Sequence, residues 1–292
     1  MEIITAKTAG FCFGVQKAVD LVYELVDKAG SEGSGVIGPI YTYGPIIHNE
    51  TGVEDLERKG VKVINTPEEI DRIKSGTIVI RSHGVSKELA ERAASCGAVC
   101  QDATCPFVQR IHRIVEEESD GGAQIIIIGN AGHPEVVGIM GWSSTPAVVI
   151  ENEEEAESYR GDPEKPVCIV SQTTFNVIKF NELVAILKSR LYNVNVVNTI
   201  CNATRERQEE ARSIASDADV MIVIGGKTSS NSAKLYEICG KECANTFFIQ
   251  TVDDLHLNLS GKEKVIGITA GASTPKNIIE EVQNYVRTGR EF

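Results

Sequence analysis

Asp102-Ala103-Thr104-Cys105-Pro106-Phe107-Val108 places a cysteine where a short strand ends and a helix begins, and this arrangement occurs three times in the chain. The first copy contains Cys12 and the third contains Cys201. Cys105 follows Cys12 by 93 residues, and Cys201 follows Cys105 by 96 residues. A period near one third of the 292-residue chain predicts three related units, each of which brings one thiol to the same kind of junction.

Two further strand-to-helix turns recur after each cysteine. Counted from the cysteine, the second turn comes 36, 28 and 28 residues later, and the third comes 71, 68 and 72 residues later. The residues at these turns are His48, His133 and Ser229 for the second turn, and His83, Thr173 and Ser273 for the third. Strands that alternate with helices predict parallel sheets, and ligands bind at the carboxyl ends of parallel strands.

The predicted fold class is therefore α/β, with three similar units and mainly parallel sheets. We place the units at residues 1–97, 98–193 and 194–292, although the N-terminal strand at 3–5 can pair with the first or the third unit. If the units are arranged about a pseudo-threefold axis with their carboxyl ends inward, all nine turns line one central cavity.

Local patterns place individual elements. Valines at 15, 19, 22 and 26 predict a helix that Gly30 ends. Thr66 and Glu69 flank Pro67 in the pattern of a capping box, which predicts the start of another helix. Four consecutive isoleucines at 125–128 predict a buried strand, and the acidic run at 151–157 predicts a solvated helix face.

Composition and charge exclude several classes of protein. The chain is 42% hydrophobic and 24% charged, as expected for a globular protein. Its net charge of −12 argues against nucleic acid as the main partner, because duplex binding requires a clustered basic face. No apolar run has the length of a membrane span, and no signal peptide is evident. We therefore expect a cytoplasmic protein, and a monomer because no heptad seam calls for a partner chain.

The nine turns offer thiols, imidazoles, hydroxyls and helix N-termini whose N–H groups attract anions. This set suits a phosphate or diphosphate group. Three cysteines without a fourth at a corresponding turn suit an iron–sulfur cluster that leaves one iron open to substrate. Structural zinc fits less well, because the chain has no CxxC pair. We expect Cys12, Cys105 and Cys201 to converge on one such cluster.

The motifs around these turns, taken together, resemble those of the 4-hydroxy-3-methylbut-2-enyl diphosphate reductases, the last enzymes of the non-mevalonate isoprenoid pathway. The resemblance extends from residue 4 to about residue 285. The motifs that carry it are Ala9-Gly10-Phe11-Cys12-Phe13-Gly14-Val15, Ile47-His48-Asn49, Arg81-Ser82-His83-Gly84, Asp102-Ala103-Thr104-Cys105-Pro106, Gly132-His133-Pro134-Glu135, Ser171-Gln172-Thr173-Thr174, Ser229-Ser230-Asn231-Ser232 and Thr269-Ala270-Gly271-Ala272-Ser273.

The resemblance implies a role for each of these motifs. One [4Fe-4S] cluster per chain would be held by Cys12, Cys105 and Cys201, and its fourth iron would take the allylic hydroxyl oxygen of the substrate. Glu135 would deliver protons, with Thr173 beside the hydroxyl to relay or orient them. The diphosphate would be bound by His48, His83, His133, Ser229, Ser230, Asn231 and Ser273.

The resemblance also implies the overall reaction and the partner. Two electrons, supplied by ferredoxin or flavodoxin, and two protons convert (E)-4-hydroxy-3-methylbut-2-enyl diphosphate to isopentenyl or dimethylallyl diphosphate with loss of water. Independently of the resemblance, a carboxyl two residues from a phosphate-binding histidine is well placed as a general acid. A dianionic ligand nearby should make Glu135 easier to protonate than in water.

Each assignment has a less specific alternative. A single cysteine at a strand end usually packs in the core. Cys96, Cys100, Cys168, Cys239 and Cys243 fall at positions that the repeat does not share, and we assign them no role. We interpret His112 and His256 as structural or surface histidines, Trp142 as packing, and the Glu209-Glu210 pair as solvated surface.

Three classes of function are compatible with the residues. The first is the iron–sulfur reductase. The second is a non-redox α/β protein that binds a phosphate ligand and whose cysteines are structural, although no GxxxxGK[ST] loop is present. The third is a binding protein without chemistry, which would leave the three cysteines, Glu135 and Thr173 unexplained.

Overall fold

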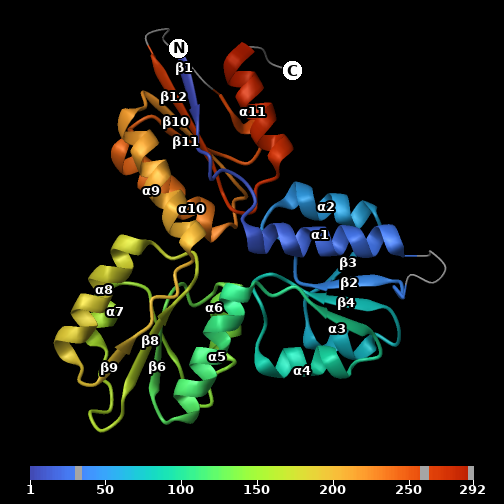
Figure 1. The fold of residues 1–292 in the computed structure, drawn as a ribbon, viewed down its shortest axis with the longest axis vertical. Helices are drawn as coiled ribbons and strands as arrows, with labels where there is room; N and C mark the ends of the chain where they lie inside the picture. The colour runs from blue at the N-terminus through green and yellow to red at the C-terminus, as the bar shows by residue number, and fades with distance from the viewer. Residues whose placement is uncertain (30–34, 257–262, 289–292) are drawn as a thin grey trace. The chain divides into compact units, whose positions relative to one another are not determined.

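The computed structural model describes residues 1–29, 35–256 and 263–288, and within these ranges the strands form three four-stranded sheets (Figure 1). Every strand pair in the three sheets is parallel. The α/β class with three similar parallel sheets is therefore confirmed. The predicted helix end at Gly30 lies outside the described residues, and the arrangement about an axis stays a prediction.

The strands are named by sheet. Sheet A contains, in spatial order, β1 (Glu2–Thr5), β12 (Val265–Ala270), β10 (Val220–Ile224) and β11 (Thr246–Ile249). Sheet B contains β5 (Val99–Asp102), β4 (Thr77–Ile80), β2 (Ile40–Tyr43) and β3 (Lys62–Ile64). Sheet C contains β9 (Val194–Val196), β8 (Val167–Ser171), β6 (Gln124–Ile128) and β7 (Val148–Ile150).

The helices follow the strands along the chain. They are α1 (Phe13–Lys28), α2 (Glu50–Arg58), α3 (Pro67–Arg72), α4 (Lys87–Ser95), α5 (Pro106–Asp120), α6 (Pro134–Met140), α7 (Glu153–Ser158), α8 (Val177–Arg190), α9 (Asn202–Asp217), α10 (Ser230–Glu242) and α11 (Lys276–Thr288), with a short 3-10 helix at Val252–Asp254. The sequence patterns do not predict β3 and β11, which are short edge strands of three and four residues.

All three sheets have the same internal order. In each sheet, the strand that precedes a cysteine is an edge strand. Beside it lies the strand that leads to the third turn, and beside that one lies the strand that leads to the second turn. Consequently β1 pairs with β12, β5 with β4, and β9 with β8. The second predicted unit begins with β5, but β5 belongs to sheet B together with strands of the first predicted unit. In the same way, β9 begins the third predicted unit but belongs to sheet C. The motif repeat does not reveal this shift, because hydrogen-bonded register decides which sheet a strand joins.

The sheet grouping also differs from the grouping of turns by repeat. In the repeat, Cys12 shares a unit with His48 and His83, whereas β1 places Cys12 on sheet A with the turns of Ser229 and Ser273. By the same shift, Cys105 shares sheet B with His48 and His83, and Cys201 shares sheet C with His133 and Thr173. The three-unit division stays a prediction.

The core of sheet C follows directly from its sequence. The four isoleucines of β6 are at most 1% exposed, and alternate members pack on opposite helix layers. Ile126 and Ile128 contact the cluster that contains Phe180 and Leu183 of α8, whereas Ile125 and Ile127 contact the cluster that contains Ile111 and Val115 of α5. A central parallel strand is covered on both faces, so that a continuous apolar run is required.

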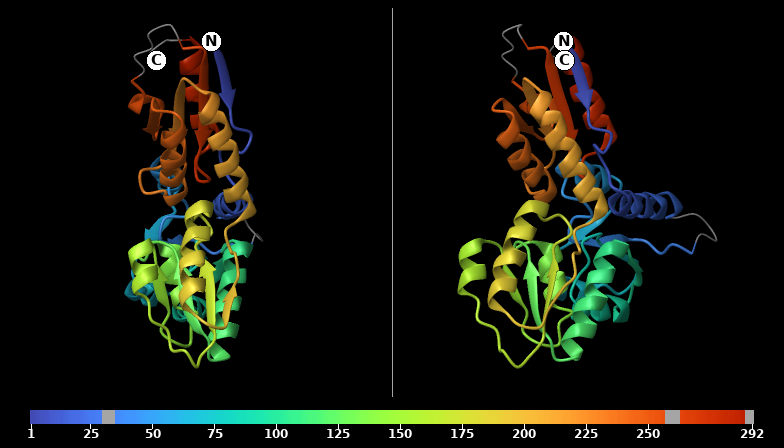
Figure 2. Two further views of the ribbon diagram at one scale, coloured as in Figure 1. Left: turned by 90° about the vertical axis from the view of Figure 1, so that its left-hand side faces the viewer. Right: turned by 60° about the vertical axis from the view of Figure 1, so that its left-hand side comes forward.

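Sheet A has the same layered construction. Alternate residues of β10 pack against α11 on one face and against α9 and α10 on the other, and Figures 1 and 2 show these helices on either side of the sheet. Val282 and Val286 of α11 are buried with Ile222 and Ile268. Helix α9 therefore lies along the sheet that ends in the turns of Ser229 and Ser273.

Side-chain caps mark the starts of helices α3 and α4, and the capping box predicted for the first of them is present. Thr66 and Glu69 form the reciprocal capping box at the start of α3. The hydroxyl of Ser86 accepts from the Leu89 amide at the start of α4. The acidic run lies on α7, where Glu153 and Glu154 are exposed as expected.

The chain divides into two compact units by its internal contacts. Unit 1 comprises Met1–Gln16, Ile47–Gly52 and Asn202–Phe292, and contains sheet A; unit 2 comprises Lys17–Ile46 and Val53–Cys201, and contains sheets B and C. Among the described residues, no helix is both long and apolar enough to cross a membrane.

Candidate active site

The same backbone hydrogen bond recurs at the carboxyl edge of every sheet. Each candidate cysteine donates its amide N–H to a carbonyl in the turn that follows the neighbouring strand. The three bonds join Cys12 N to Ala272 O (3.3 Å), Cys105 N to Ser82 O (3.0 Å) and Cys201 N to Thr173 O (3.1 Å). The backbone of each cysteine is therefore held beside one of the third turns of the repeat, at Ser273, His83 or Thr173.

The three candidate cysteines share an environment. Each is partly exposed and stands immediately before a helix: Cys12 before α1, Cys105 as the N-cap of α5, and Cys201 before α9. The positive end of a helix dipole favours a negatively charged sulfur, which is the form that binds metal. None of the three lies in an apolar core.

The remaining cysteines have a different character. Burial raises the pKa of Cys168 and of Cys239 to about 12, and that of Cys100 to about 11. Cys243 is buried in the same cluster as Cys239, and Cys96 is the C-cap of α4. No disulfide joins any of the eight cysteines, all of which lie in the described part of the chain. A three-thiolate donor set at helix N-termini fits an iron–sulfur cluster with one open iron.

Glu135 is a buried carboxyl in unit 2. It lies in the first turn of α6, and only 2% of its surface is exposed. Its Oε1 accepts from the Thr173 amide at 2.5 Å, and its Oε2 accepts from the Thr173 hydroxyl at 2.7 Å. Burial raises the pKa of Glu135 to about 7, although the bonds from Thr173 act in the opposite direction. The predicted direction of the shift is thus present without a charged ligand, since desolvation produces it.

Glu135, Thr173 and Cys201 form one connected set. The side chain and amide of Thr173 bind the Glu135 carboxylate, while the Thr173 carbonyl accepts from Cys201 N. A protonatable carboxyl is thereby held next to a candidate cluster ligand by a single intervening residue. This arrangement can deliver a proton close to the place where electrons would enter.

His133 and His83 lie together in unit 2. His133 is the N-cap of α6, and its Nδ1 accepts from the Glu135 amide at 3.1 Å. In the neutral imidazole, the proton therefore resides on Nε2, which can donate to an anion. The two rings meet edge to face with centroids 5.6 Å apart, and ligand nitrogens of the pair lie within 4.8 Å of each other.

The His83 turn is supported by a histidine that has a structural role. His112 on α5 is buried and stacks on Trp142, with ring centroids 4.9 Å apart. Burial lowers the pKa of His112 to about 4, so that the ring is neutral. Gly84 has φ +69°, and a Cβ at this position would lie 2.7 Å from the His112 ring. The structural interpretation of His112 and Trp142 is therefore consistent with their contacts, and His256 is exposed.

In unit 1, the start of α10 forms a polar cradle. Ser229 is the N-cap and accepts from the amide and the hydroxyl of Ser232. Asn231 is 5% exposed, and its Nδ2 has no hydrogen-bond partner among the residues that the structure describes. The backbone at Gly225 and at Gly271 packs closely against Ser232, since a Cβ at either position would lie 2.0 Å from the Ser232 hydroxyl oxygen. Only glycine fits at these two positions. An orphaned amide donor at a helix N-terminus suits an anionic ligand.

His48 and Ser273 meet in the same unit. The Ser273 hydroxyl donates to the His48 carbonyl at 3.2 Å. A Cβ on Gly226 would lie 2.3 Å from that carbonyl oxygen, so the turn after β10 closely approaches the His48 backbone. Unit 1 thus groups Cys12, His48 and Ser273 with the cradle at the start of α10, where Ser230 is the first helical residue.

One expectation about the surface is wrong. Glu209 is exposed as predicted, but Glu210 is half-buried and accepts from the amides of Lys7 and Thr8 and from the Thr8 hydroxyl. Its neighbour on the helix, Arg207, is buried, and no sequence pattern marked it. The sequence pattern of a polar helix predicts that its charged residues are solvated. It does not reveal that Glu210 is covered by residues 7 and 8, which lie about 200 positions earlier in the chain.

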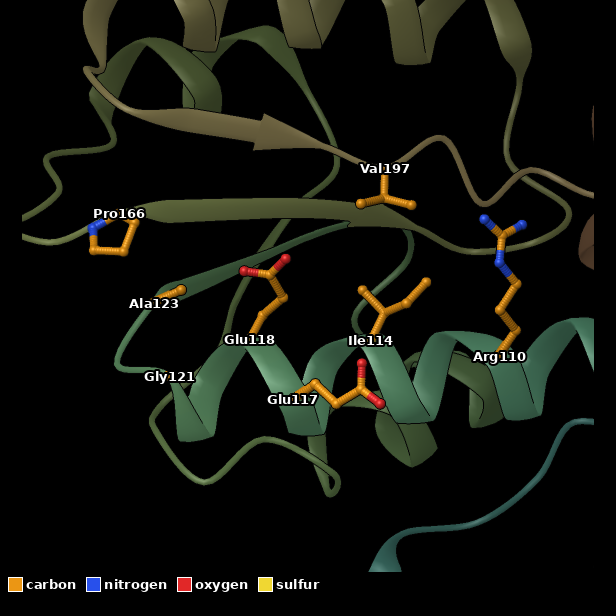
Figure 3. Close-up of a pocket in the computed structure, with 8 residues that line it drawn as sticks. All are labelled: Arg110, Ile114, Glu117, Glu118, Gly121, Ala123, Pro166 and Val197. Atoms are coloured by element: carbon orange, nitrogen blue, oxygen red, sulfur yellow. The ribbon is translucent and has the colours of Figure 1, made fainter.

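One groove in unit 2 is separate from these residues. It has a volume of about 470 Å³ and is lined by α5 and the ends of neighbouring strands, including Arg110, Glu118 and Val197 (Figure 3). None of the predicted site residues lines it. The predicted site residues instead gather at the carboxyl edges of the sheets, and the convergence of all three thiols stays a prediction.

Three parallel α/β sheets, each with a cysteine at a strand-to-helix junction, and a buried protonatable carboxyl linked through Thr173 to the backbone of one of these cysteines fit the class of iron–sulfur oxidoreductases. The chain belongs to the family described as LytB protein, whose family model matches residues 3–287.

Relatives at the level of sequence and structure agree with this family. A protein named 4-hydroxy-3-methylbut-2-enyl diphosphate reductase from Caldanaerobacter subterraneus subsp. tengcongensis is 43% identical over 288 residues, which are 99% of this chain and 97% of that protein. A protein of the same name from Clostridioides difficile is 43% identical over 287 residues, covering 98% of this chain and 99% of its own.

Two solved structures share the fold. The E-1-hydroxy-2-methyl-but-2-enyl-4-diphosphate reductase from Plasmodium falciparum has a TM-score of 0.88 at 27% identity, and covers 98% of this chain and 86% of its own. The second structure is of an (E)-4-hydroxy-3-methyl-but-2-enyl diphosphate reductase, described as the terminal enzyme of the non-mevalonate pathway. It has a TM-score of 0.69 at 39% identity, and the match covers 98% of this chain and 99% of that protein. These matches confirm the family expected from the motifs.

Proposed function

We propose that this protein is a 4-hydroxy-3-methylbut-2-enyl diphosphate reductase. It removes the hydroxyl group of (E)-4-hydroxy-3-methylbut-2-enyl diphosphate and releases isopentenyl or dimethylallyl diphosphate, in the last step of non-mevalonate isoprenoid synthesis. The conversion consumes two electrons and two protons, breaks the carbon–oxygen bond, forms one carbon–hydrogen bond and releases water. The observation that carries the proposal is the connected set of Glu135, Thr173 and Cys201.

Cys12, Cys105 and Cys201 would hold one [4Fe-4S] cluster. When bound, the cluster supplies the two electrons in single steps and a Lewis-acidic iron for the hydroxyl oxygen. The support in this chain is the shared position of the three thiols at helix N-termini and their shared backbone hydrogen bond.

Glu135 is the proton source. Its pKa of about 7 keeps a large fraction protonated at neutral pH, which is the condition for an efficient general acid. The Thr173 hydroxyl donates to Glu135, while the Thr173 carbonyl accepts from the Cys201 amide, and we assign this hydroxyl the role of relaying or orienting the proton. Protonation of the departing oxygen lowers the barrier to breaking the carbon–oxygen bond.

The polar groups that we assign to the diphosphate lie at strand-to-helix turns. In unit 1 the start of α10 offers Ser229, Ser230 and the unpartnered amide of Asn231, and Ser273 lies in the neighbouring turn. In unit 2, His83 and His133 offer imidazole N–H groups, and His48 contributes from its own segment. Binding at the diphosphate, remote from the reacting carbon, orients the hydroxyl.

We also propose a small electron-transfer protein, ferredoxin or flavodoxin, as the donor, because each delivers the single electrons that a cluster accepts. The enzyme acts as a monomer in the cytoplasm, where thiols remain reduced and available as ligands.

Purification without oxygen tests the proposal directly. We expect a brown protein with about four irons and four sulfides per chain, following from the cluster type. It should convert the substrate when a chemical reductant is supplied. Serine in place of Cys12, Cys105 or Cys201 should reduce the iron content, whereas Cys239→Ser, at a buried position, is the matched control. A colourless, metal-free protein that binds diphosphate would instead support the non-redox alternative.

A further inference from the structure

Arg207 is a buried cation that joins two separate segments of unit 1. It lies on α9 and is 3% exposed. Its Nη1 donates to the Ala270 carbonyl, and its Nη2 donates to the Gly10 carbonyl at 2.8 Å. A guanidinium is suited to this task, since its planar fork can hold two acceptors at once.

Glu210 lies one helical turn further along and holds the same N-terminal segment. Its Oε1 accepts from the Lys7 amide at 2.9 Å. Its Oε2 accepts from the Thr8 amide at 2.9 Å and from the Thr8 hydroxyl at 2.6 Å. Residues three apart on a helix share one face, so Arg207 and Glu210 together contact residues 7–10. We call this pair the α9 clamp.

The clamped segments carry predicted ligands. Gly10 lies two residues before Cys12, and Ala270 lies two residues before Ala272, whose carbonyl accepts from Cys12 N. The clamp therefore fixes both the chain that enters Cys12 and the turn to which the Cys12 amide is bonded. Ser273 follows in the same turn, and α9 itself begins at the residue after Cys201.

Stabilisation of the contact between α9 and sheet A does not by itself explain why charged side chains occupy positions 207 and 210. Burial of a guanidinium is costly unless its donors are satisfied, and an apolar side chain would stabilise a helix–sheet contact as well or better. The hydrogen bonds of the clamp described above tie backbone groups of residues 7, 8 and 10, together with the Thr8 hydroxyl, to the same helix face that binds the carbonyl of Ala270 at the end of β12. The polar groups thus determine the position of one short segment.

We propose that Arg207 and Glu210 are positioning residues that hold Cys12 in the geometry required to ligate the cluster. The proposal rests on the cluster assigned under the proposed function. Without the clamp, the segment before Cys12 opens more often, and the Cys12 thiolate leaves the cluster more readily.

The test compares Arg207→Met and Arg207→Lys with the parent chain in anaerobic, cluster-loaded protein. Lysine retains the charge but cannot bridge two carbonyls as guanidinium does. We expect both variants to lose iron to a chelator about tenfold faster, the factor that corresponds to loss of one net charge-assisted hydrogen bond. The electron paramagnetic resonance spectrum of the reduced cluster should change as well, and amide hydrogen exchange at residues 8–12 should accelerate.

Two controls separate positioning from general stability. Arg212→Met removes a partly exposed arginine of the same helix, which pairs with Glu242. Val282→Ala removes buried volume from the α11 side of sheet A and should lower the unfolding midpoint. Neither control should change the spectrum or the rate of iron loss. Glu210→Gln provides a milder change should Arg207 variants fail to fold, and a smaller acceleration of iron loss in the same direction is expected, because glutamine keeps one of the two acceptor oxygens.

The outcomes are distinguishable. A parent chain that binds no iron under these conditions would remove the proposed function, and the clamp proposal with it. A parent that binds its cluster, together with Arg207 and Glu210 variants that retain iron and spectrum as the parent does, would overturn the clamp proposal alone. If Val282→Ala lost iron as fast as the Arg207 variants, the clamp proposal would also be overturned, because general destabilisation of the fold would then be sufficient to explain the faster iron loss.

Discussion

The hydroxyl of Thr173 donates to Oε2 of Glu135 at 2.7 Å, while the amide of the same residue donates to Oε1. One residue therefore satisfies both oxygens of a carboxyl that is 2% exposed. Burial disfavours the carboxylate and the two bonds favour it, and burial is the larger effect. The result is an acid with a pKa of about 7, held in a fixed orientation by the residue whose carbonyl accepts from the Cys201 amide.

The first prediction concerns the pH dependence of the reaction. Because the protonated form of Glu135 is the active one, kcat/KM should fall as pH rises through about 7, the pKa of the free enzyme. Glu135→Gln should lose product formation while iron content stays that of the parent. Steady-state rates with a chemical reductant, together with iron analysis, measure both effects. Unchanged activity in Glu135→Gln would remove Glu135 as the proton source.

The second prediction concerns Thr173. Thr173→Val removes the hydroxyl that stabilises the carboxylate, so the pKa of Glu135 should rise and the descending limb of the kcat/KM profile should move to higher pH. Thr173→Ser retains the donor and should keep the profile of the parent. Thr174→Val is the matched control, since Thr174 contacts Gln172 and not Glu135. A Thr173→Val profile that coincides with the parent would contradict the prediction.

The third prediction concerns stability. The folded-state pKa of Glu135 is raised above its ordinary value of 4.5, so the folded state binds this proton more tightly than the unfolded state does. Stability attributable to the neutral carboxyl is present below pH 4.5 and declines as pH rises to about 7. Relative to Glu135→Gln, the parent should lose roughly 3 kcal/mol across this range, from about 1.4 kcal/mol per pKa unit. Urea unfolding at several pH values measures the difference, and parallel curves would refute it.

The fourth prediction concerns the diphosphate cradle. Within the described part of the chain, the buried Nδ2 of Asn231 lacks a partner, so it is available to donate to a phosphate oxygen. Asn231→Ala should raise KM by about tenfold to a hundredfold, the range for a lost hydrogen bond to a charged group. Asn231→Asp keeps the size but adds a negative charge, and should raise KM further. Inhibition by inorganic diphosphate provides an independent measure. An unaltered KM in both variants would exclude Asn231 from the binding site.

The fifth prediction compares two glycines near α10. Gly226→Ala would place a Cβ 2.3 Å from the His48 carbonyl, so the His48 segment must shift and KM should rise. Gly240→Ala, inside α10, meets no atom within 4 Å and should stabilise the protein by about 0.5–1 kcal/mol. Kinetics and thermal unfolding of both variants check this contrast. Normal KM in Gly226→Ala would show that the approach to His48 does not matter for substrate.

The sequence by itself determined the class of fold, the positions of most elements and the candidate residues. The reason is physical: apolar runs such as residues 125–128 must be buried strands, and a cap such as Thr66 with Glu69 starts a helix, whatever surrounds them. A motif repeated at constant spacing likewise indicates which junctions are equivalent, as the shared hydrogen bond of the three cysteine amides demonstrates.

Only the tertiary structure decided which strands share a sheet and which distant groups meet. The pairing of β1 with β12 depends on hydrogen-bonded register between residues about 263 positions apart, which no local pattern encodes. Burial of Glu135 and Arg207 depends on covering segments, Thr173 for one and the Cys12 loop for the other. Charge and pKa follow from such burial, so an acidic or basic residue acquires its role only when the chain has folded around it.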